Sequence, residues 1–316
     1  MALIVSDYQA VPENARGASV ALGNFDGVHA GHRAVIGSAA EFAEAGKAPL
    51  ATLIFEPPPR RFFQPDSEPF RIMRPEKRRE TLSALGVEVI FELPFNKAMS
   101  QMSPREFVKT VLVDGMALSH LSVGFDFRFG KGREGDTTTL KTLSNEFGFS
   151  FSVLGRVTDG DAKISSTAIR NALQDGRPGI AAQLLGTYWV ADGVVEHGEK
   201  RGRTIGFPTA NLTLGNLIHP RHGIYAVWAR IEGEADWRAG VANYGRTPTT
   251  GERAPLLEVF LFDFEGDLYD KHLEVAFVSF IRTEEKFDSL DALVVQMHRD
   301  TEAAKEILKD HPAPVA

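Results

Sequence analysis

Helix and strand patterns alternate along residues 1–185, and this alternation constrains the fold more than any other feature of the sequence. Short apolar runs are separated by stretches with the 3.6-residue spacing of amphipathic helices. The expected strands are Ala18–Leu22, Leu50–Phe55, Val87–Leu93, Leu121–Phe125 and Phe149–Leu154; the expected helices are Gly31–Ala45, Pro75–Leu85, one opened by a capping box at Ser103–Glu106, and Thr137–Phe147. This repeated succession predicts a parallel α/β sheet with right-handed crossovers.

The pattern changes after Leu185. The segments that follow have the alternation and turn residues of antiparallel strands. The expected strands are Trp189–Val195, Gly223–Arg230, Leu256–Phe264 and Leu273–Phe280, with a hairpin-type turn at Glu265–Asp267. One long helix, apolar on one face from Leu290 to Leu308, closes the chain. The sequence therefore predicts two domains, 1–185 and 186–316, the second a small antiparallel barrel with a C-terminal helix.

Charge and cysteine content exclude several classes of protein. The chain has 316 residues and no Cys, which excludes disulfide scaffolds, zinc–thiolate sites and cysteine nucleophiles. Residues 1–185 carry 21 basic and 21 acidic side chains, so the net charge of −7 lies in residues 186–316, with 14 and 21. This balance argues against nucleic-acid and anionic-membrane binding. The basic residues between Arg71 and Arg79 are interpreted as a solvated face.

We also expect neither a membrane-spanning segment nor a signal peptide. No apolar run approaches the roughly 18–20 residues that span a bilayer. The N-terminal segment lacks the basic start and small-residue cleavage site of a signal peptide. We therefore expect a cytoplasmic protein.

A glycine-rich segment, Gly23–His32, lies where a predicted strand ends and a helix begins. Glycine permits a tight turn, and the free amides of a helix start attract phosphate. His29 and His32 are three residues apart, so their rings would point at the same anion. The alternative is a glycine-rich turn with two surface histidines.

Two other segments of the first domain carry weaker signals. Ser165, Ser166 and Thr167 precede a helical run with Arg170 one turn in, which indicates either a phosphate site or an ordinary N-cap. Val123–Gly130 follows a strand and is rich in glycine, as expected of a ligand-binding loop or of a mobile surface loop.

The second domain contains a basic, glycine-rich segment, Gly193–Arg203, of a kind that can fold over nucleotide phosphates. Thr209 and Asn211 then alternate on an extended segment, which would place both neutral oxygens on one side. Such a pair can hold Mg²⁺ together with phosphate and water. Glu258 stands alone in an apolar strand, where it either faces solvent by alternation or serves as a base.

Together these segments resemble the bacterial bifunctional riboflavin kinase/FAD synthetase family over nearly the whole chain. The adenylyltransferase domain of that family, which has a Rossmann-like nucleotidyltransferase fold, is similar to GNFDGVHAGH, VGFDFRFG and ISSTAIR. Its riboflavin kinase barrel is similar to GVVEHGEKRGRTIGFPTANL, GIYAVWA, GVANYG, LEVFLFDFEGDLY and IRTEEKFDSLDAL. The chain departs from the family pattern at Pro58, Arg246, Phe260 and Asp270.

The resemblance implies two successive reactions. In the C-terminal domain the riboflavin 5′-hydroxyl attacks the γ-phosphate of ATP, Glu258 takes the proton, and Thr209 and Asn211 hold Mg²⁺. In the N-terminal domain the FMN phosphate attacks the α-phosphate of a second ATP to give FAD and pyrophosphate. His29 and His32 then neutralise the charge that develops on the phosphates.

The resemblance also implies three sets of binding residues. The ATP-binding set of the adenylyltransferase is Gly23, Asn24, Phe25, Asp26, His29, His32, Ser165, Ser166, Thr167 and Arg170. Its flavin or nucleotide loop is Asp126, Phe127 and Arg128. The ATP- and flavin-binding set of the kinase is Gly198, Lys200, Arg201, Gly202, Arg203, Gly206, Pro208, Thr209, Asn211 and Arg282.

The expected partners are therefore ATP, riboflavin, FMN and FAD, with no nucleic acid and no membrane, and the expected state is a monomer or weak homo-oligomer. Two alternatives stay open. In the first, the chain is a riboflavin kinase whose other domain is inactive or divergent. In the second, it is a non-catalytic regulator that binds flavin or nucleotide.

Overall fold

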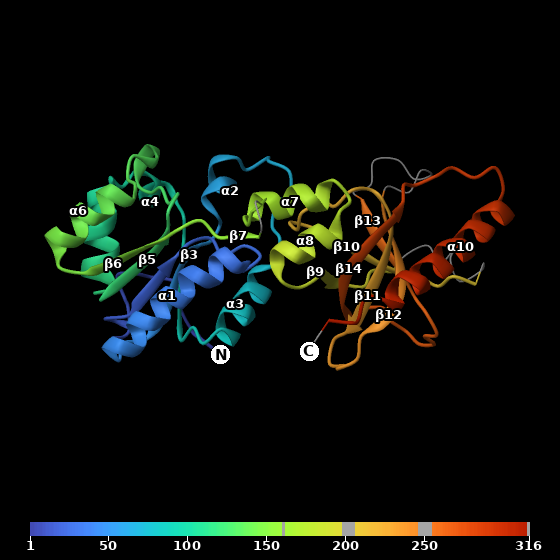
Figure 1. The fold of residues 1–316 in the computed structure, drawn as a ribbon, viewed down its shortest axis with the longest axis horizontal. Helices are drawn as coiled ribbons and strands as arrows, with labels where there is room; N and C mark the ends of the chain where they lie inside the picture. Colours follow the sequence, from blue (N-terminus) through green and yellow to red (C-terminus); the bar gives the residue numbers. More distant parts are fainter. Residues whose placement is uncertain (160–161, 198–205, 246–254, 315–316) are drawn as a thin grey trace. The chain divides into compact units, whose positions relative to one another are not determined.

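The computed structural model of the chain describes residues 1–159, 162–197, 206–245 and 255–314 (Figure 1). Contacts within the chain define two compact units. Unit 1 contains Met1–Glu68 and Arg74–Ser165, and unit 2 contains Pro69–Met73 and Ser166–Ala316.

The division after Ser165 lies ahead of the boundary predicted at Gly186, and two helices account for the difference. Helix α7 (Ser166–Gln174) packs on α8 (Pro178–Leu185). Helix α8 in turn packs on two strands of unit 2, β9 (Trp189–Val194) and β14 (His272–Arg282). Both helices therefore group with the barrel, although they precede it in the sequence.

A six-stranded parallel sheet forms the centre of unit 1; the sequence predicts a parallel sheet and all of its strands except β1. Its strands are β1 (Leu3–Val5), β2 (Ser19–Leu22), β3 (Leu50–Phe55), β4 (Val89–Leu93), β5 (His120–Gly124) and β6 (Ser150–Leu154). They lie in the order β1-β4-β3-β2-β5-β6. The chain winds from β2 to β4 and then returns to β5 on the other side of β2. Ligands of doubly wound sheets bind outside the carboxyl ends of the strands at such a reversal.

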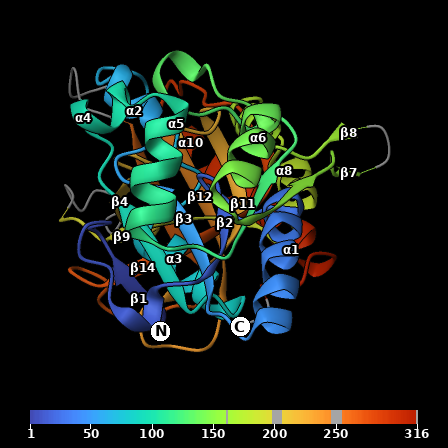
Figure 2. The same cartoon turned by 90° about the vertical axis from the view of Figure 1, so that its left-hand side faces the viewer.

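Helices cover both faces of this sheet. Helix α1 (Ala30–Gly46) packs on one face, and α5 (Pro104–Glu106) with its continuation η2 (Phe107–Gly115) packs on the other (Figure 2). The Ser103–Glu106 capping box is present. The other elements of unit 1 are η1 (Glu13–Ala15), α2 (Pro59–Phe63), α3 (Pro75–Ala84), α4 (Lys97–Gln101), η3 (Lys131–Arg133), α6 (Thr137–Phe147) and the hairpin β7 (Thr158–Asp159) and β8 (Ala162–Lys163).

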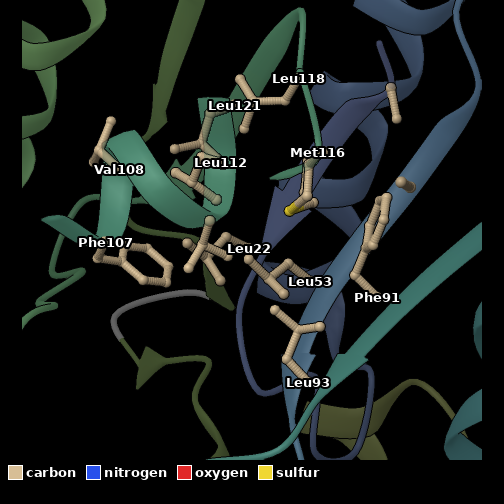
Figure 3. Packing of buried hydrophobic residues seen from close by; sticks show 14 of the residues in the cluster. Leu22, Leu53, Phe91, Leu93, Phe107, Val108, Leu112, Met116, Leu118 and Leu121 are labelled. Atoms are coloured by element: carbon tan, nitrogen blue, oxygen red, sulfur yellow. The ribbon is translucent and has the colours of Figure 1, made fainter. Parts of the chain in front are cut away.

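The core of unit 1 lies between the sheet and η2 (Figure 3). Leu22 of β2 and Leu53 of β3 pack with Phe107 and Leu112 of the helix. Leu53 and Leu112 are fully buried and Leu22 is nearly so. This packing fixes the strand that leads into the Gly23–His32 segment.

Unit 2 contains an antiparallel barrel that is nearly closed. Its strands are β9, β10 (Ala210–Thr213), β11 (Gly223–Ile231), β12 (Arg238–Gly245), β13 (Leu256–Leu261) and β14, in the order β10-β13-β12-β11-β14-β9. The backbone N–H of Glu196, just past β9, donates to the carbonyl of Asn211 at 2.8 Å and so links the two ends of the sheet. Helix α10 (Leu290–Lys309) packs on β11, β12 and β14.

Two details of the barrel differ from the sequence predictions. The turn at Glu265–Asp267 does not form a hairpin, because β13 pairs with β10 and β12 whereas β14 pairs with β11 and β9. Strand β12 was not predicted. It contains Gly240 and Gly245, and glycine is unfavourable in strands unless a close approach requires it. A Cβ at Gly240 would lie 2.7 Å from the carbonyl oxygen of Phe260.

Within the described ranges, no helix is both long enough and apolar enough to cross a membrane.

His120, at the start of β5, gives a prediction about stability. Its ring is 1% exposed and stacks on the ring of Phe42 with centroids 3.6 Å apart. Its nitrogens lie 2.7 Å from Ser150 Oγ and 3.0 Å from Ser122 Oγ. Burial lowers the pKa of His120 to about 4 from its ordinary value of 6.5. The free energy of unfolding should therefore fall as pH drops from 6.5 toward 4, because only the unfolded chain binds this proton.

Urea unfolding between pH 4 and 7.5 measures this effect. The variant His120→Gln retains a hydrogen-bonding side chain that does not titrate, so its stability should depend less on pH in this range. A variant with the same pH dependence as the wild type would contradict the prediction.

Candidate active sites

The loop between β2 and α1 has an uncommon backbone. Phe25 and Val28 have φ of +49° and +40°, and Gly27 has +91°. Positive φ is costly for a β-branched residue such as valine. Strain of this kind persists only where the surrounding structure fixes it, and it is common at functional sites. The side chains of Phe25 and Val28 are each 1% exposed, so the core anchors the loop.

The structure brings His29 and His32 together at the start of α1. His29 is the N-cap, and its Nδ1 accepts a hydrogen bond from the backbone N–H of His32 at 3.3 Å. The two rings stack with centroids 3.7 Å apart. Because Nδ1 of His29 accepts, the neutral ring carries its proton on Nε2, where it can be donated to an anion.

Gly31 leaves room for this pair. A Cβ at Gly31 would lie 3.1 Å from Cε1 of His29, and 3.9 Å from the carbonyl oxygen of Ile164. The chain that leads into Ser165 therefore passes close to the start of α1.

The rest of the ISSTAIR segment belongs to unit 2. Ser166, Thr167 and Arg170 lie in the first turns of α7. Nε of Arg170 donates to the carbonyl of Phe70 at 2.6 Å, and the guanidinium lies 5.6 Å from the centroid of the Phe70 ring. A phosphate-binding role for these residues stays a prediction.

The loop after β5 leaves the sheet beside the loop after β2, because the two strands are parallel neighbours. Phe127 stacks on Phe129 with centroids 5.7 Å apart. Asp126 and Arg128 are exposed, and Arg128 lies 3.5 Å from the carboxylate of Asp136. Two of the three predicted segments of the adenylyltransferase therefore meet at the reversal of strand order.

The basic cluster at the start of α3 is not the solvated face that the sequence indicated. Arg78 is only 3% exposed. It forms an ion pair with Glu56 at 3.1 Å and lies 3.7 Å from Glu92. Its Nη1 donates to the carbonyl of Asn24 at 3.2 Å. The prediction was wrong for Arg78 because the carboxylates that draw it inward lie at the ends of β3 and β4, and the residue pattern of α3 alone does not show that these strand ends approach the helix.

In unit 2, three predicted kinase residues lie in one row across the barrel. Asn211 of β10 pairs with Glu258 of β13, and Glu258 pairs with Asn243 of β12. The row continues through Ile224 of β11 to Arg282 of β14. Val241 and Phe260 lie two positions from Asn243 and Glu258 and therefore on the same face of the sheet. Both pack with residues of α10, so the row lies on the face of the sheet that α10 partly covers.

Glu258 is partly buried rather than on a solvent face. Burial raises the pKa of its carboxyl, and the charge of Glu284 raises it further, whereas a hydrogen bond from Asn243 lowers it. The Asn243 amide donates to Glu258 Oε2 at 3.5 Å, a long hydrogen bond. A carboxyl whose pKa is raised by burial is suited to accept a proton near neutral pH.

The residues before β10 line a small cavity. Pro208 and Thr209 border it together with Val259, Leu261 and Tyr269, and its volume is about 40 Å³. Thr209 precedes the strand, so alternation along β10 does not determine its direction. Gly206 has φ of +83°. The predicted residues Gly198, Lys200, Arg201, Gly202 and Arg203 lie outside the described residues, as does Arg246.

Arg282 makes contacts within unit 2. Its Nε and Nη2 donate to both carboxylate oxygens of Asp300 at 2.8 and 2.7 Å, and its Nη1 donates to the carbonyl of Thr283. This bidentate pair attaches α10 to β14. A direct role for Arg282 in substrate binding stays a prediction.

Two departures from the family pattern have a structural account. Asp270 has φ of +61°, a region that favours the glycine common at this position. Its carboxylate lies 3.3 Å from Nε2 of His197, which stacks on Tyr269. Phe260 packs against Phe207 with ring centroids 5.0 Å apart. Pro58 is the N-cap of α2, and nothing in the structure explains why it replaces histidine.

The oxygen donors in unit 2 fit a magnesium ion better than a transition metal. The described residues contain no group of three His, Cys, Asp or Glu that could hold a metal. The amide oxygens of Asn211 and Asn243 are both buried and, in the described parts of the chain, lack a hydrogen-bond partner. Neutral oxygens on either side of a carboxylate suit Mg²⁺ and its water.

Sequence reasoning missed Asn243 and Arg78. Asn243 is recognisable only through the β12–β13 register, which places it opposite Glu258. The sequence does show an arginine on a helix between two strands that end near glutamates, Glu56 and Glu92. Many solvent-exposed helices have the same pattern, so it does not identify a buried arginine.

The two units correspond to two known families of domain. The FAD synthetase family matches residues 11–168, and the riboflavin kinase family matches residues 185–308. These two matches identify the chain as a two-domain enzyme of flavin nucleotide synthesis.

Relatives of the whole chain support the same class. The bifunctional riboflavin kinase/FMN adenylyltransferase of Escherichia coli (strain K12) is 39% identical over 290 residues, 92% of each chain. That of Bacillus subtilis (strain 168) is 38% identical and covers 95% of this chain and 96% of its own. A crystal structure described as a macrolide-efflux protein from Streptococcus pneumoniae is 31% identical, with a TM-score of 0.84 over 96% of this chain and 98% of its own. The chain belongs to the bifunctional riboflavin kinase/FMN adenylyltransferase family.

The raised pKa of Glu258 predicts an effect on stability. Replacing it with the neutral glutamine should raise the free energy of unfolding at neutral pH, because ionisation of the buried carboxyl opposes folding. The gain should shrink as pH falls toward 4.5, where the unfolded chain also becomes protonated. Urea unfolding of Glu258→Gln from pH 4 to 8 tests this. The exposed control Glu265→Gln should match the wild type throughout, and a gain for Glu258→Gln that does not vary with pH would be evidence against the burial effect.

Proposed function

We propose that this chain makes FAD in two steps at two separate sites. Unit 2 phosphorylates riboflavin with ATP to give FMN, and unit 1 transfers AMP from a second ATP to FMN, with release of pyrophosphate. The observation that carries this proposal is the separation of the two groups of residues. The paired histidines lie at the strand reversal of the parallel sheet, and Glu258 lies in the barrel.

In the kinase reaction, Glu258 accepts the proton of the riboflavin 5′-hydroxyl as the oxygen attacks the γ-phosphate. Asn243 holds the carboxylate from β12 through its amide N–H. Such a base typically contributes roughly 10²–10⁴-fold to the rate, and positioning supplies much of the rest. The cavity beside Thr209 and the glycine-rich segment before it are the proposed nucleotide-binding region, to which we also assign Gly206, Pro208 and Arg282.

We also propose that the kinase uses Mg²⁺. Asn211 and Thr209 would hold it. The buried amide oxygen of Asn211, which has no hydrogen-bond partner among the described residues, supports this assignment. The ion would supply positive charge that offsets the charge of the phosphates.

In the adenylyltransferase reaction, the FMN phosphate is itself the nucleophile, so no protein nucleophile is needed. The proton-bearing Nε2 of His29, the ring of His32 and the amides at the start of α1 would stabilise the charge that develops on the ATP phosphates. Gly23–Asp26 and Ser165 would contact the same nucleotide, and Asp126–Arg128 the flavin or nucleotide. The parts assigned to Ser166, Thr167 and Arg170 depend on the family resemblance alone.

The remaining assignments are proposals of the same kind. We assign the adenylyltransferase to residues 1–185 and the kinase to residues 186–316. We place the protein in the cytoplasm, where ATP and flavins are available, as a monomer or weak homo-oligomer.

One incubation separates the candidate functions. Purified protein with riboflavin, ATP and Mg²⁺ should yield both FMN and FAD on chromatography. FMN alone would indicate a riboflavin kinase with an inactive second domain, and neither product would indicate a non-catalytic binding protein.

The variant Glu258→Gln should lose 10²–10⁴-fold in FMN formation, because it removes the proton acceptor and keeps the shape of the side chain. The same preparation should convert supplied FMN to FAD at the wild-type rate, which serves as the control for folding. Loss of both activities would contradict the separation of the sites.

The variant His32→Ala should have the converse effect. Removing one donor to developing phosphate charge typically costs about 10²–10³-fold in kcat. FAD formation from FMN should fall by this amount while FMN formation from riboflavin is retained. Normal FAD formation would exclude His32 from the phosphate site.

A further inference from the structure

Arg78 connects the ends of three neighbouring strands of unit 1. Its donors reach the carbonyl of Asn24, two residues after β2, and the carboxylate of Glu56, one residue after β3. Its guanidinium also lies 3.7 Å from the carboxylate of Glu92 in β4. All three strands are parallel, so these contacts lie at the carboxyl edge of the sheet, where its ligands bind.

The position of Arg78 is itself tightly fixed. Its side chain is 3% exposed, and a charge this buried is retained only where partners compensate for the lost hydration. Glu92, one of these partners, is 8% exposed and also accepts a hydrogen bond at 3.0 Å from Nε of the neighbouring Arg79. The planar guanidinium is therefore held by Glu56 and Glu92 and presents one nitrogen to the loop after β2.

That loop needs such an anchor. Its residues Phe25 and Val28 have positive φ, and the backbone N–H of Val28 bonds back to the carbonyl of Phe25 at 3.3 Å. The loop ends at His29, whose ring direction decides whether it meets a phosphate. A contact at Asn24 fixes the start of the strained segment, while α1 fixes its end.

We propose that Arg78 is a positioning residue of the adenylyltransferase, which holds the Asn24–Val28 loop, and through it His29, in the geometry that meets the ATP phosphates. This inference rests on the proposed adenylyltransferase function of unit 1. Arg78 acts through the loop and does not itself contact the substrate.

Arg79 offers a matched control. It lies next to Arg78 on α3 and binds the same Glu92, but no contact joins it to the loop in the described structure. The variants Arg78→Met, Arg78→Lys and Arg79→Met of the full chain therefore separate loss of the loop contact from loss of a charge on α3. Lysine keeps the charge but lacks the planar fork that reaches Asn24 and Glu56 together.

The first measurement is independent of catalysis. Hydrogen–deuterium exchange of the free protein should show the amides of residues 25–32 exchanging at least fivefold faster in Arg78→Met and Arg78→Lys than in the wild type. Arg79→Met should stay within twofold of the wild type. Equal exchange in the Arg78 and Arg79 variants would overturn the proposal.

The second measurement is the kinetics of FAD formation from FMN. A misplacement of about 1 Å can cost on the order of 10²-fold, so kcat should fall 10–100-fold in Arg78→Met and at least fivefold in Arg78→Lys. The KM for ATP should change less than threefold, and FMN formation by unit 2 should be retained. Wild-type kcat in Arg78→Lys would overturn the proposal, as would a loss equal to that of Arg79→Met.

If Arg78→Met also loses FMN formation, it has unfolded, and Arg78→Lys then decides. A wild-type protein that makes no FAD would refute the proposed function of unit 1. The exchange measurement would still report whether Arg78 holds the loop.

Discussion

The parallel pairing of β2 with β5 brings together the two loops that we propose for the chemistry of unit 1. These strands are about a hundred residues apart in the sequence, and their backbone hydrogen bonds bring Gly23–His32 beside Phe125–Gly130. The strand order reverses between β2 and β5, and ligands of doubly wound sheets bind at such a reversal.

In the barrel, strand register brings together the polar residues of the proposed kinase site. In the proposed kinase reaction the base is Glu258. Strand register places it beside Asn211 and Asn243, because the three residues come from three neighbouring strands and lie in one row. The pKa of the Glu258 carboxyl reflects opposing effects: burial and the charge of Glu284 raise it, and the hydrogen bond from Asn243 lowers it. The excess of acidic residues in 186–316 therefore has a local effect, because one of them, Glu284, raises the pKa of the proposed base.

The sequence sufficed where local pattern decides structure. The bounds of Leu50–Phe55 and Thr137–Phe147 agree with the observed β3 and α6. The first is a short, almost wholly apolar run, and the second is an amphipathic helix between an Asp136 N-cap and a Gly148 C-cap. The i, i+3 spacing of His29 and His32 likewise determines their proximity. Strand β12 was not predicted because it contains glycines, which only the close approach of neighbouring segments explains. The burial of Arg78 was not predicted because its partners lie at the ends of two strands outside α3. Contacts between distant segments leave little trace in a single sequence.

The short segment Pro69–Met73 has a consequence for dividing this protein into parts. It interrupts unit 1 but belongs to unit 2, where the indole N–H of Trp189 donates to the carbonyl of Ile72 at 2.8 Å and Ile218 donates to that of Arg71. A fragment that starts at Ser166 or Gly186 would lack these acceptors and would leave a buried indole donor unsatisfied, at a cost of about 1–3 kcal/mol. The chain crosses between its units three times, so no single cut separates them.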